Sequence, residues 1–257
     1  MPELSVSPAL DVASVTRLDL TRNHGGPEPR THGGPPGPGR FICFEGIDGA
    51  GKTTIAKGVA ERLLAAGQPV LYLEKKCPQF PSSFLRHHMQ IVGAALWHSP
   101  KGAPIGTLGD DHWLHLMVSW FAALDHSCVR PALRHGRWIV TDNWYYKFIA
   151  RFAAKPSYTL GYLEQCFARI SVPTDVIMLD VAPEVAAGRR HEFSQTEHGR
   201  LDGGTQGDPD EFIRYQGRIG GILKSFGAAH HWHFIDSTRL TAEAVTQRAT
   251  STILASV

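Results

Sequence analysis

The stretch that decides the fold reads FICFEGIDGAGKTTIAKG and runs from Phe41 to Gly58. An apolar run leads into a glycine-rich turn, and Ile55, Val59 and Leu63 then repeat every four residues, as along one face of a helix. Residues 46–53, GIDGAGKT, fit the pattern G-x-x-x-x-G-K-[ST], which is informative only between a strand and a helix. That context favours a phosphate-binding loop over a chance glycine turn.

Each residue type in this loop has a physical use in binding a nucleoside triphosphate. Glycines let the backbone curl so that successive N–H groups point at phosphate oxygens, and the helix that follows adds the positive end of its dipole. Lys52 supplies a positive charge for the β- and γ-phosphates, and the Thr53 hydroxyl is placed to ligate Mg²⁺. We therefore expect ATP and Mg²⁺ to bind here, through Gly46, Asp48, Gly49, Ala50, Gly51, Lys52, Thr53 and Thr54.

A carboxylate at the end of a neighbouring strand commonly completes such a magnesium site. Asp142 ends the apolar run WIVTD and stands at such a place. We expect it to hold Mg²⁺ through a water molecule or to polarise the acceptor; the alternative is an aspartate that only caps the following helix. Lys52 and Asp142 are thus candidate catalytic residues, and Thr53 and Asp142 are candidate metal ligands.

The remainder of the folded part alternates short apolar runs with helical patterns. This alternation predicts an α/β fold with parallel strands, and runs with little polar alternation fit a sheet covered on both faces. A stripe of Trp113, Met117, Trp120 and Leu124 marks a second helix, which Pro131 is expected to bend or end. The predicted strands are residues 40–45, 69–74, 137–142, 175–180 and 231–236.

Composition excludes several classes of protein. The 257 residues carry a net charge of +2 with histidines neutral, which indicates neither a nucleic-acid binder nor a membrane-surface protein. No apolar run approaches the roughly 20 residues that span a bilayer, and the four widely spaced cysteines are typical of free thiols in a reducing cytosol. The histidines lack partners at metal-ligand spacing. We therefore expect a cytoplasmic protein with no nucleic-acid or membrane partner.

The first 39 residues differ in composition from the rest. Eleven of the fifteen residues in 25–39 are glycine or proline, and such a segment cannot build a core. We expect residues 1–39 to form a disordered arm, with a partner-binding polyproline segment as the alternative. Residues 40–257 are expected to form the folded domain.

Five segments, in order, resemble the thymidylate kinase family of P-loop nucleoside monophosphate kinases. FICFEGIDGAGKTT is similar to the family's opening F-I-x-x-E-G-x-[DE]-G-x-G-K-[ST]-T, and VRPALRHGRWIVTDNW is similar to its I-x-P-A-L-x-x-G-x-x-V-x-x-D-R stretch. PTDVIMLDVAPEVAAGRR resembles its P-D-L-x-x-x-L-D-V-x-P-E-x-A-x-x-R segment, and RYQGRIGGILKSF and HFIDSTRLTAEAV resemble its later helix and last strand. The resemblance covers nearly all of residues 40–257.

The resemblance implies a P-loop kinase fold, which is a three-layer sandwich with a five-stranded parallel sheet, helices on both faces and a mobile lid at about residues 188–206. It implies transfer of the γ-phosphoryl group of ATP to a small-molecule acceptor phosphate. It also implies a homodimer built on helices, for which the stripe in residues 112–124 is a candidate face, although the same stripe fits a core equally.

The resemblance also assigns roles near the phosphates. Asp48 matches the family's acidic position that faces the acceptor sugar. Members that lack a loop arginine supply one from the lid, where it would neutralise charge on the transferred oxygens. The candidate catalytic arginines are therefore Arg189, Arg190 and Arg200, and a solvated basic loop is the alternative.

Three departures from the family pattern fall on the acceptor side. Asn143 replaces the arginine after the third strand, Phe121 or a neighbour stands where a helix arginine is expected, and Lys75 falls opposite the arginine after the second strand. A lysine is a point charge that cannot make the bidentate phosphate contact of arginine. We therefore expect an altered acceptor, bound near Asp48, Glu74, Lys75, Phe121, Asn143, Trp144 and Lys147.

Three functions remain open at this point. The first is a nucleotide kinase that phosphorylates dTMP or a related or modified nucleoside monophosphate. The second is a kinase acting on the hydroxyl of a nucleoside or specialised small molecule; Glu74 would then be the general base rather than a solvated acid, and Trp144 would stack on the acceptor rather than pack in the core. The third is a catalytically inactive nucleotide-binding module, against which Lys52, Thr53 and Asp142 argue.

Overall fold

The computed structural model describes most of the predicted folded domain. The described residues are 38–76, 78, 80, 82–98, 103–190, 197, 199 and 209–256. Almost all of the predicted arm, and most of the predicted lid, lie outside this set, so both segments stay predictions.

A five-stranded parallel sheet forms the centre of the fold. Its spatial order is β2-β3-β1-β4-β5, and every neighbouring pair is parallel. The prediction of this sheet is confirmed, and each strand ends within two residues of its predicted limits. The strands are β1 (Phe41–Glu45), β2 (Val70–Leu73), β3 (Trp138–Thr141), β4 (Asp175–Asp180) and β5 (His233–Asp236).

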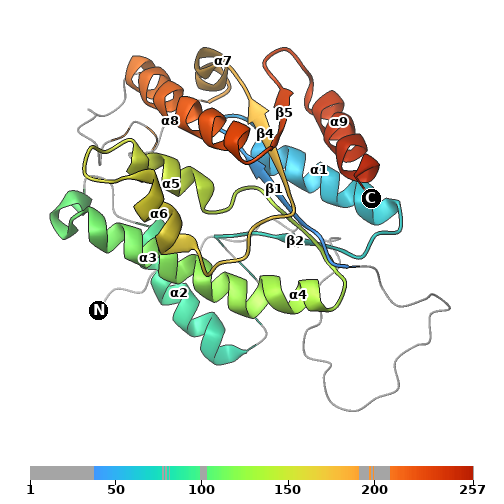
Figure 1. Cartoon of the computed structure of the whole chain (residues 1–257), viewed down its shortest axis with the longest axis horizontal. Helices are drawn as coiled ribbons and strands as arrows, with labels where there is room; N and C mark the ends of the chain where they lie inside the picture. Colours follow the sequence, from blue (N-terminus) through green and yellow to red (C-terminus); the bar gives the residue numbers. More distant parts are fainter. Residues whose placement is uncertain are drawn as a thin grey trace, which may run out of the picture. The chain divides into compact units, whose positions relative to one another are not determined.

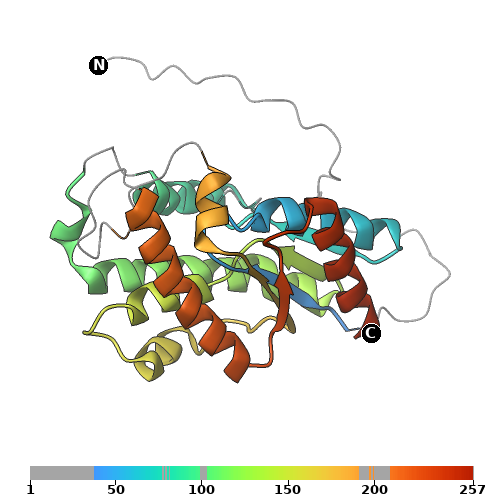
Figure 2. The same ribbon diagram turned by 90° about the horizontal axis from the view of Figure 1, so that it is seen from above.

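Helices cover both faces of the sheet, as expected for a three-layer sandwich. Alternate residues of β1 point to opposite faces: Ile42 and Phe44 join one buried cluster, and Phe41 and Cys43 join the other. The first cluster includes residues of α1 (Lys52–Ala65), α7 (Pro183–Gly188) and α9 (Ala242–Ala255). Figures 1 and 2 show α1 and α9 packed side by side on this face.

The opposite face carries the larger cluster, which is rich in aromatic residues. Its helices are α2 (Ser83–Trp97), α3 (Asp110–Leu124), α4 (Arg130–Arg134), α5 (Tyr146–Ala153), α6 (Leu160–Phe167) and α8 (Pro209–Ala229). A 3₁₀ turn at Ile105–Leu108 precedes α3. The helical stripe predicted in residues 112–124 therefore contributes to the core, because Met117, Trp120 and Leu124 are buried.

Of the two outcomes expected at Pro131, a bend or an end, the end does not occur, because the helical path passes through this residue. A π-helical turn at Asp125–Val129 joins α3 to α4, and the helical path continues through the proline to Arg134 (Figure 1). Proline lacks the N–H that a regular α-helix needs four residues after a carbonyl, and a widened turn just before it accommodates the lost bond. The proline is thus placed near the start of a short helical segment, where its missing N–H costs least.

The polar groups that matter below gather where the strands end. In parallel sheets of this kind, ligands bind in the crevice beyond the carboxyl ends of the strands. Glu45 ends β1, Lys75 follows β2 by two residues, and Asp142 and Asn143 come directly after β3. Among the described residues, no helix combines the length and hydropathy required to cross a membrane.

Candidate active site

The glycine loop adopts a backbone that only glycine accepts readily. Gly46, Gly49 and Gly51 have φ angles of 145°, 82° and 86°. A Cβ atom on Gly49 would also lie 2.6 Å from the carbonyl oxygen of Ala186 in α7, so two constraints act at that position. The loop is therefore shaped by its glycines and packed closely against the helix that follows β4.

The helix after the loop begins with donors that have no intrahelical partner. Gly51 provides no side-chain cap for α1, and the first N–H groups of any α-helix lack partners within the helix. The Nζ atom of Lys52 curls back over the loop and donates to the carbonyl oxygens of Gly46, at 3.0 Å, and Ile47, at 2.7 Å. A positive charge, a helix N-terminus and a concave backbone thus converge, which is the requirement for binding phosphate groups.

Thr53 and Asp142 meet beside the loop, as the predicted magnesium site requires. The Thr53 hydroxyl donates to Asp142 Oδ2 at 2.5 Å, although the residues are 89 positions apart. Mg²⁺ is typically held by one or two protein oxygens together with substrate phosphates and water. A hydroxyl and a carboxylate suit that ion, whereas the described residues contain no group of three or more His, Cys, Asp or Glu side chains that could hold a metal alone.

Asp48 is the centre of a buried ionic cluster. Its carboxylate pairs with Lys147 and with Arg151 at 3.0 Å, both of which project from α5 one helical turn apart. Burial by itself would raise the pKa of Asp48, but Lys147 and Arg151 outweigh it and hold the pKa well below its ordinary value. Asp48 is therefore an ion with two cationic partners.

Gln216 of α8 completes this cluster and was missed by the sequence analysis. Its amide oxygen accepts from the backbone N–H of Asp48 at 2.9 Å, and its nitrogen donates to Asp48 Oδ2 at 3.2 Å and to the carbonyl oxygen of Glu197 at 2.9 Å. The side chain is fully buried. No local pattern distinguishes Gln216 from the other polar residues of an amphipathic helix, so only the fold shows its position.

A second buried network begins at Glu45, another residue that the sequence analysis left without a role. This carboxylate accepts from Asn143 Nδ2 at 2.6 Å and from the backbone N–H of Trp144 at 2.9 Å. Asn143 Oδ1 in turn accepts from Lys75 Nζ at 2.8 Å, and that ammonium lies 3.8 Å from Asp142 Oδ1. Burial raises the pKa of Glu45 to about 7 and lowers that of Lys75 to about 8.

Comparisons with known proteins found relatives of this chain. No family model matches the chain. A thymidylate kinase from Burkholderia vietnamiensis is 28% identical over 218 residues, covering 80% of this chain and 93% of that protein. One from Thiobacillus denitrificans is 26% identical over 224 residues, with 81% and 93% covered, and one from Ralstonia nicotianae is 29% identical over 167 residues, with 59% and 70% covered.

The chain is similar to thymidylate kinases over most of its length. Similarity that spans most of both chains, joined to a five-stranded parallel sheet and a phosphate-binding loop, is characteristic of P-loop nucleotide kinases. The expectations about fold class and kinase type are thereby confirmed.

The aromatic residues expected at the acceptor of this thymidylate kinase-like chain lie in the core instead. Phe121 and Trp144 are fully buried, and their rings pack edge to face with centroids 4.9 Å apart. The Trp144 Nε1 atom donates to the carbonyl oxygen of Ser171 at 3.0 Å. Since neither ring has an open face, we correct the expectation that they contact an acceptor: packing accounts for both side chains. Glu74, by contrast, is exposed at the end of β2.

The lid arginines are placed differently from one another. Arg189 donates to the carbonyl oxygen of Ser237 at 3.0 Å, which directs it toward the loop after β5. Arg190 pairs with Glu197 at 3.0 Å. Arg200 lies outside the described residues.

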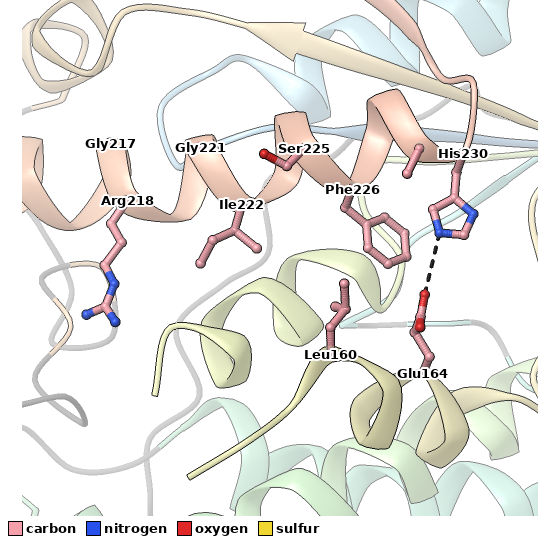
Figure 3. A pocket seen from close by; sticks show the side chains of 10 residues that line it. Leu160, Glu164, Gly217, Arg218, Gly221, Ile222, Ser225, Phe226 and His230 are labelled. Atoms are coloured by element: carbon pink, nitrogen blue, oxygen red, sulfur yellow. Dashed lines mark ion pairs between the residues drawn. The ribbon is translucent and has the colours of Figure 1, made fainter. Parts of the chain in front are cut away.

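A cavity between two helices is separate from this site. It measures about 530 Å³ and lies between α6 and α8, with mainly apolar walls (Figure 3). His230 Nε2 lies 3.5 Å from Glu164 Oε1 at one end of it. No residue of the loop or of the two networks lines the cavity, so the chemistry described above takes place elsewhere.

Proposed function

We propose that this chain transfers the γ-phosphoryl group of ATP to a nucleoside monophosphate. The observation that carries this proposal is the meeting, at one edge of the sheet, of a phosphate-binding loop and three buried or half-buried cations that do not belong to it. These cations are Lys75, Lys147 and Arg151. The loop accounts for a donor triphosphate, and the additional cations favour a second anionic ligand.

The donor side would act by placement and charge. The backbone N–H groups of the loop and the Lys52 ammonium would bind the β- and γ-phosphates, the ammonium exchanging its bonds to the carbonyl oxygens of Gly46 and Ile47 for phosphate oxygens. Thr53 and Asp142 would hold Mg²⁺, which neutralises charge on the transferred group when bound.

The acceptor side is supported by a count of charges. Four basic side chains (Lys52, Lys75, Lys147 and Arg151) lie with three acidic ones (Glu45, Asp48 and Asp142) at this end of the sheet, and burial lowers the pKa of Lys75 and Lys147 and raises that of Glu45. The Nε atom of Arg151 is buried and has no hydrogen-bond partner among the described residues. An acceptor phosphate would supply a negative charge and an acceptor atom for this N–H group, whereas an uncharged hydroxyl compound would supply an acceptor atom without the charge.

The test is phosphoryl transfer measured against a panel of acceptors. ATP and Mg²⁺ are offered with nucleoside monophosphates, dTMP among them, and with the matching nucleosides, and ADP release is followed. Turnover with at least one monophosphate, and its loss in Lys52→Ala but not in the surface variant Lys57→Ala, is the expected result. Turnover with nucleosides alone would replace the proposal by a hydroxyl kinase, and tight ATP binding without any turnover would indicate an inactive nucleotide-binding module.

A further inference from the structure

The Glu45 carboxylate is an unusual group to find inside a sheet. It is fully buried at the end of β1, one residue before the glycine loop. Its hydrogen-bond donors are the Asn143 amide, the Trp144 backbone and the Cys43 thiol at 3.6 Å, none of which is charged. Buried carboxylates are normally paired with a cation, so the position of the nearest cation needs an explanation.

That cation is Lys75, and it reaches Glu45 only through Asn143. The asparagine donates from Nδ2 to the carboxylate and accepts at Oδ1 from the ammonium, at 2.6 and 2.8 Å. The two neighbours fix the direction of the amide, because the reversed orientation would set its NH₂ group against an ammonium and its oxygen against a carboxylate. Asn143 therefore acts as an oriented bridge between two opposite charges.

The bridge determines where the ammonium lies. Lys75 Nζ is 3.8 Å from Asp142 Oδ1, and the other oxygen of that carboxylate accepts from Thr53. The backbone carbonyl of Lys75 accepts from Trp120 Nε1 at 3.0 Å, so the main chain is anchored as well. A flexible lysine side chain is thus held at both ends beside the group that would bind magnesium.

We propose that Glu45 and Asn143 are positioning residues that hold the Lys75 ammonium at the acceptor side of Asp142, where it contacts the phosphate of the acceptor. The acceptor part of this inference rests on the proposed function. A lysine has more rotamer freedom than an arginine and makes no bidentate contact, so it needs such a support to act as a directed phosphate ligand.

A double-mutant cycle on acceptor binding tests this inference. The variants are Lys75→Met, Asn143→Leu and the pair together, with the exposed lysine variant Lys57→Met as control. Each single variant is expected to raise the acceptor KM by roughly tenfold to a hundredfold, the range for a hydrogen bond to a charged group, while the ATP KM stays unchanged. The double variant should be no worse than Lys75→Met, because Asn143 acts through that lysine.

The inference would be overturned if the acceptor KM of the double variant rose by the product of the two single-variant increases, since Asn143 would then act independently of Lys75. An equal rise in both KM values would overturn it too, because it would indicate a general loss of structure. If Asn143→Leu does not fold, Asn143→Ser replaces it: serine keeps a polar group but cannot span both partners.

A second measurement does not depend on turnover and so separates this inference from the proposed function. Lysines are methylated with a ¹³C label, which keeps their charge and leaves one N–H for the amide. The Lys75 signal, assigned by its absence in Lys75→Arg, is expected to move in Asn143→Leu and in Glu45→Gln while the Lys57 signal stays. A Lys75 signal that does not move would refute the positioning role, even in a chain that phosphorylates every acceptor offered. If no acceptor is phosphorylated, the proposed function fails and this signal alone decides the positioning.

Discussion

Replacing Glu45 by glutamine should change how stability depends on pH. The carboxyl group is ionised freely in the unfolded chain but resists ionisation in the folded chain, where burial raises its pKa from 4.5 to about 7. A carboxyl whose pKa is higher in the folded state opposes folding once it is ionised. Its cost is therefore absent at acid pH, where both states are protonated, and grows as the pH rises toward 7.

The magnitude follows from the shift. A rise of about 2.5 units at 1.36 kcal/mol per unit corresponds to about 3 kcal/mol between the acid limit and pH values above 7. Glu45 is fully buried, so no correction for solvent screening applies. The charged groups that bear on it, Lys75, Lys52 and Lys147, all lower its pKa and leave the net direction upward.

The variant Glu45→Gln does not titrate but otherwise keeps the shape of the side chain. Its amide cannot accept from both Asn143 and Trp144, so it loses a hydrogen bond by an amount that is the same at every pH. The informative quantity is thus the slope of the free energy of unfolding against pH and not its value at one pH.

Urea denaturation of both proteins between pH 5 and 7.5, followed by tryptophan fluorescence, measures this slope. The upper limit stays below the pKa of Lys75, which is lowered to about 8. Relative to Glu45→Gln, the wild-type chain should lose about 2 kcal/mol of stability across the range, since part of the cost is already present at pH 5. The exposed variant Glu61→Gln should run parallel to the wild type. Parallel curves for the wild type and Glu45→Gln would show that burial does not control this carboxyl group.

Two further predictions concern the loop. Gly49→Ala should lower the free energy of unfolding by about 2 kcal/mol or more, because this residue has a positive φ and its new Cβ would lie only 2.6 Å from a backbone oxygen of α7. Gly51→Ala should cost only about 1 kcal/mol, because its φ is also positive but its Cβ would meet nothing within 4 Å. Equal losses for the two variants in urea titrations would contradict this reasoning. Asp48→Asn should lower the free energy of unfolding by about 3 kcal/mol at pH 7, because Lys147 and Arg151 lose their carboxylate partner. The difference in free energy from the wild type should shrink as the pH falls through the lowered pKa of Asp48. A difference that does not depend on pH would argue against the ion pairs.

Local patterns were sufficient for the features that depend on neighbouring residues. The loop was predictable because its glycines, lysine and threonine are contiguous, and the strands were predictable because buried parallel strands are short apolar runs. The pairing of Thr53 with Asp142 followed from one additional step, since the carboxyl ends of adjacent parallel strands meet at one edge.

Features that depend on packing between distant segments were not predictable in the same way. The convergence of Lys147 and Arg151 on Asp48 requires the place of α5 relative to the loop, which no spacing in the sequence specifies. The same holds for Phe121 and Trp144, because an aromatic residue near a site and one in the core look identical until the fold orients them.

The departures on the acceptor side are better understood as one change than as separate losses. An arginine at position 143 would bring a positive charge directly to Glu45 and would present a fixed fork to an acceptor phosphate. Asn143 brings no charge, so the charge that offsets Glu45 must come from elsewhere, and Lys75 supplies it through the amide. The same ammonium then remains beside Asp142. An asparagine without the lysine would leave a buried carboxylate unpaired, and a lysine without the asparagine would lack the contact that directs it. If the chain acts as proposed, the site would keep a cation for the acceptor phosphate but change its form from a planar fork to a single point of charge, which would alter the geometry of the favoured acceptor more than the sign of its charge.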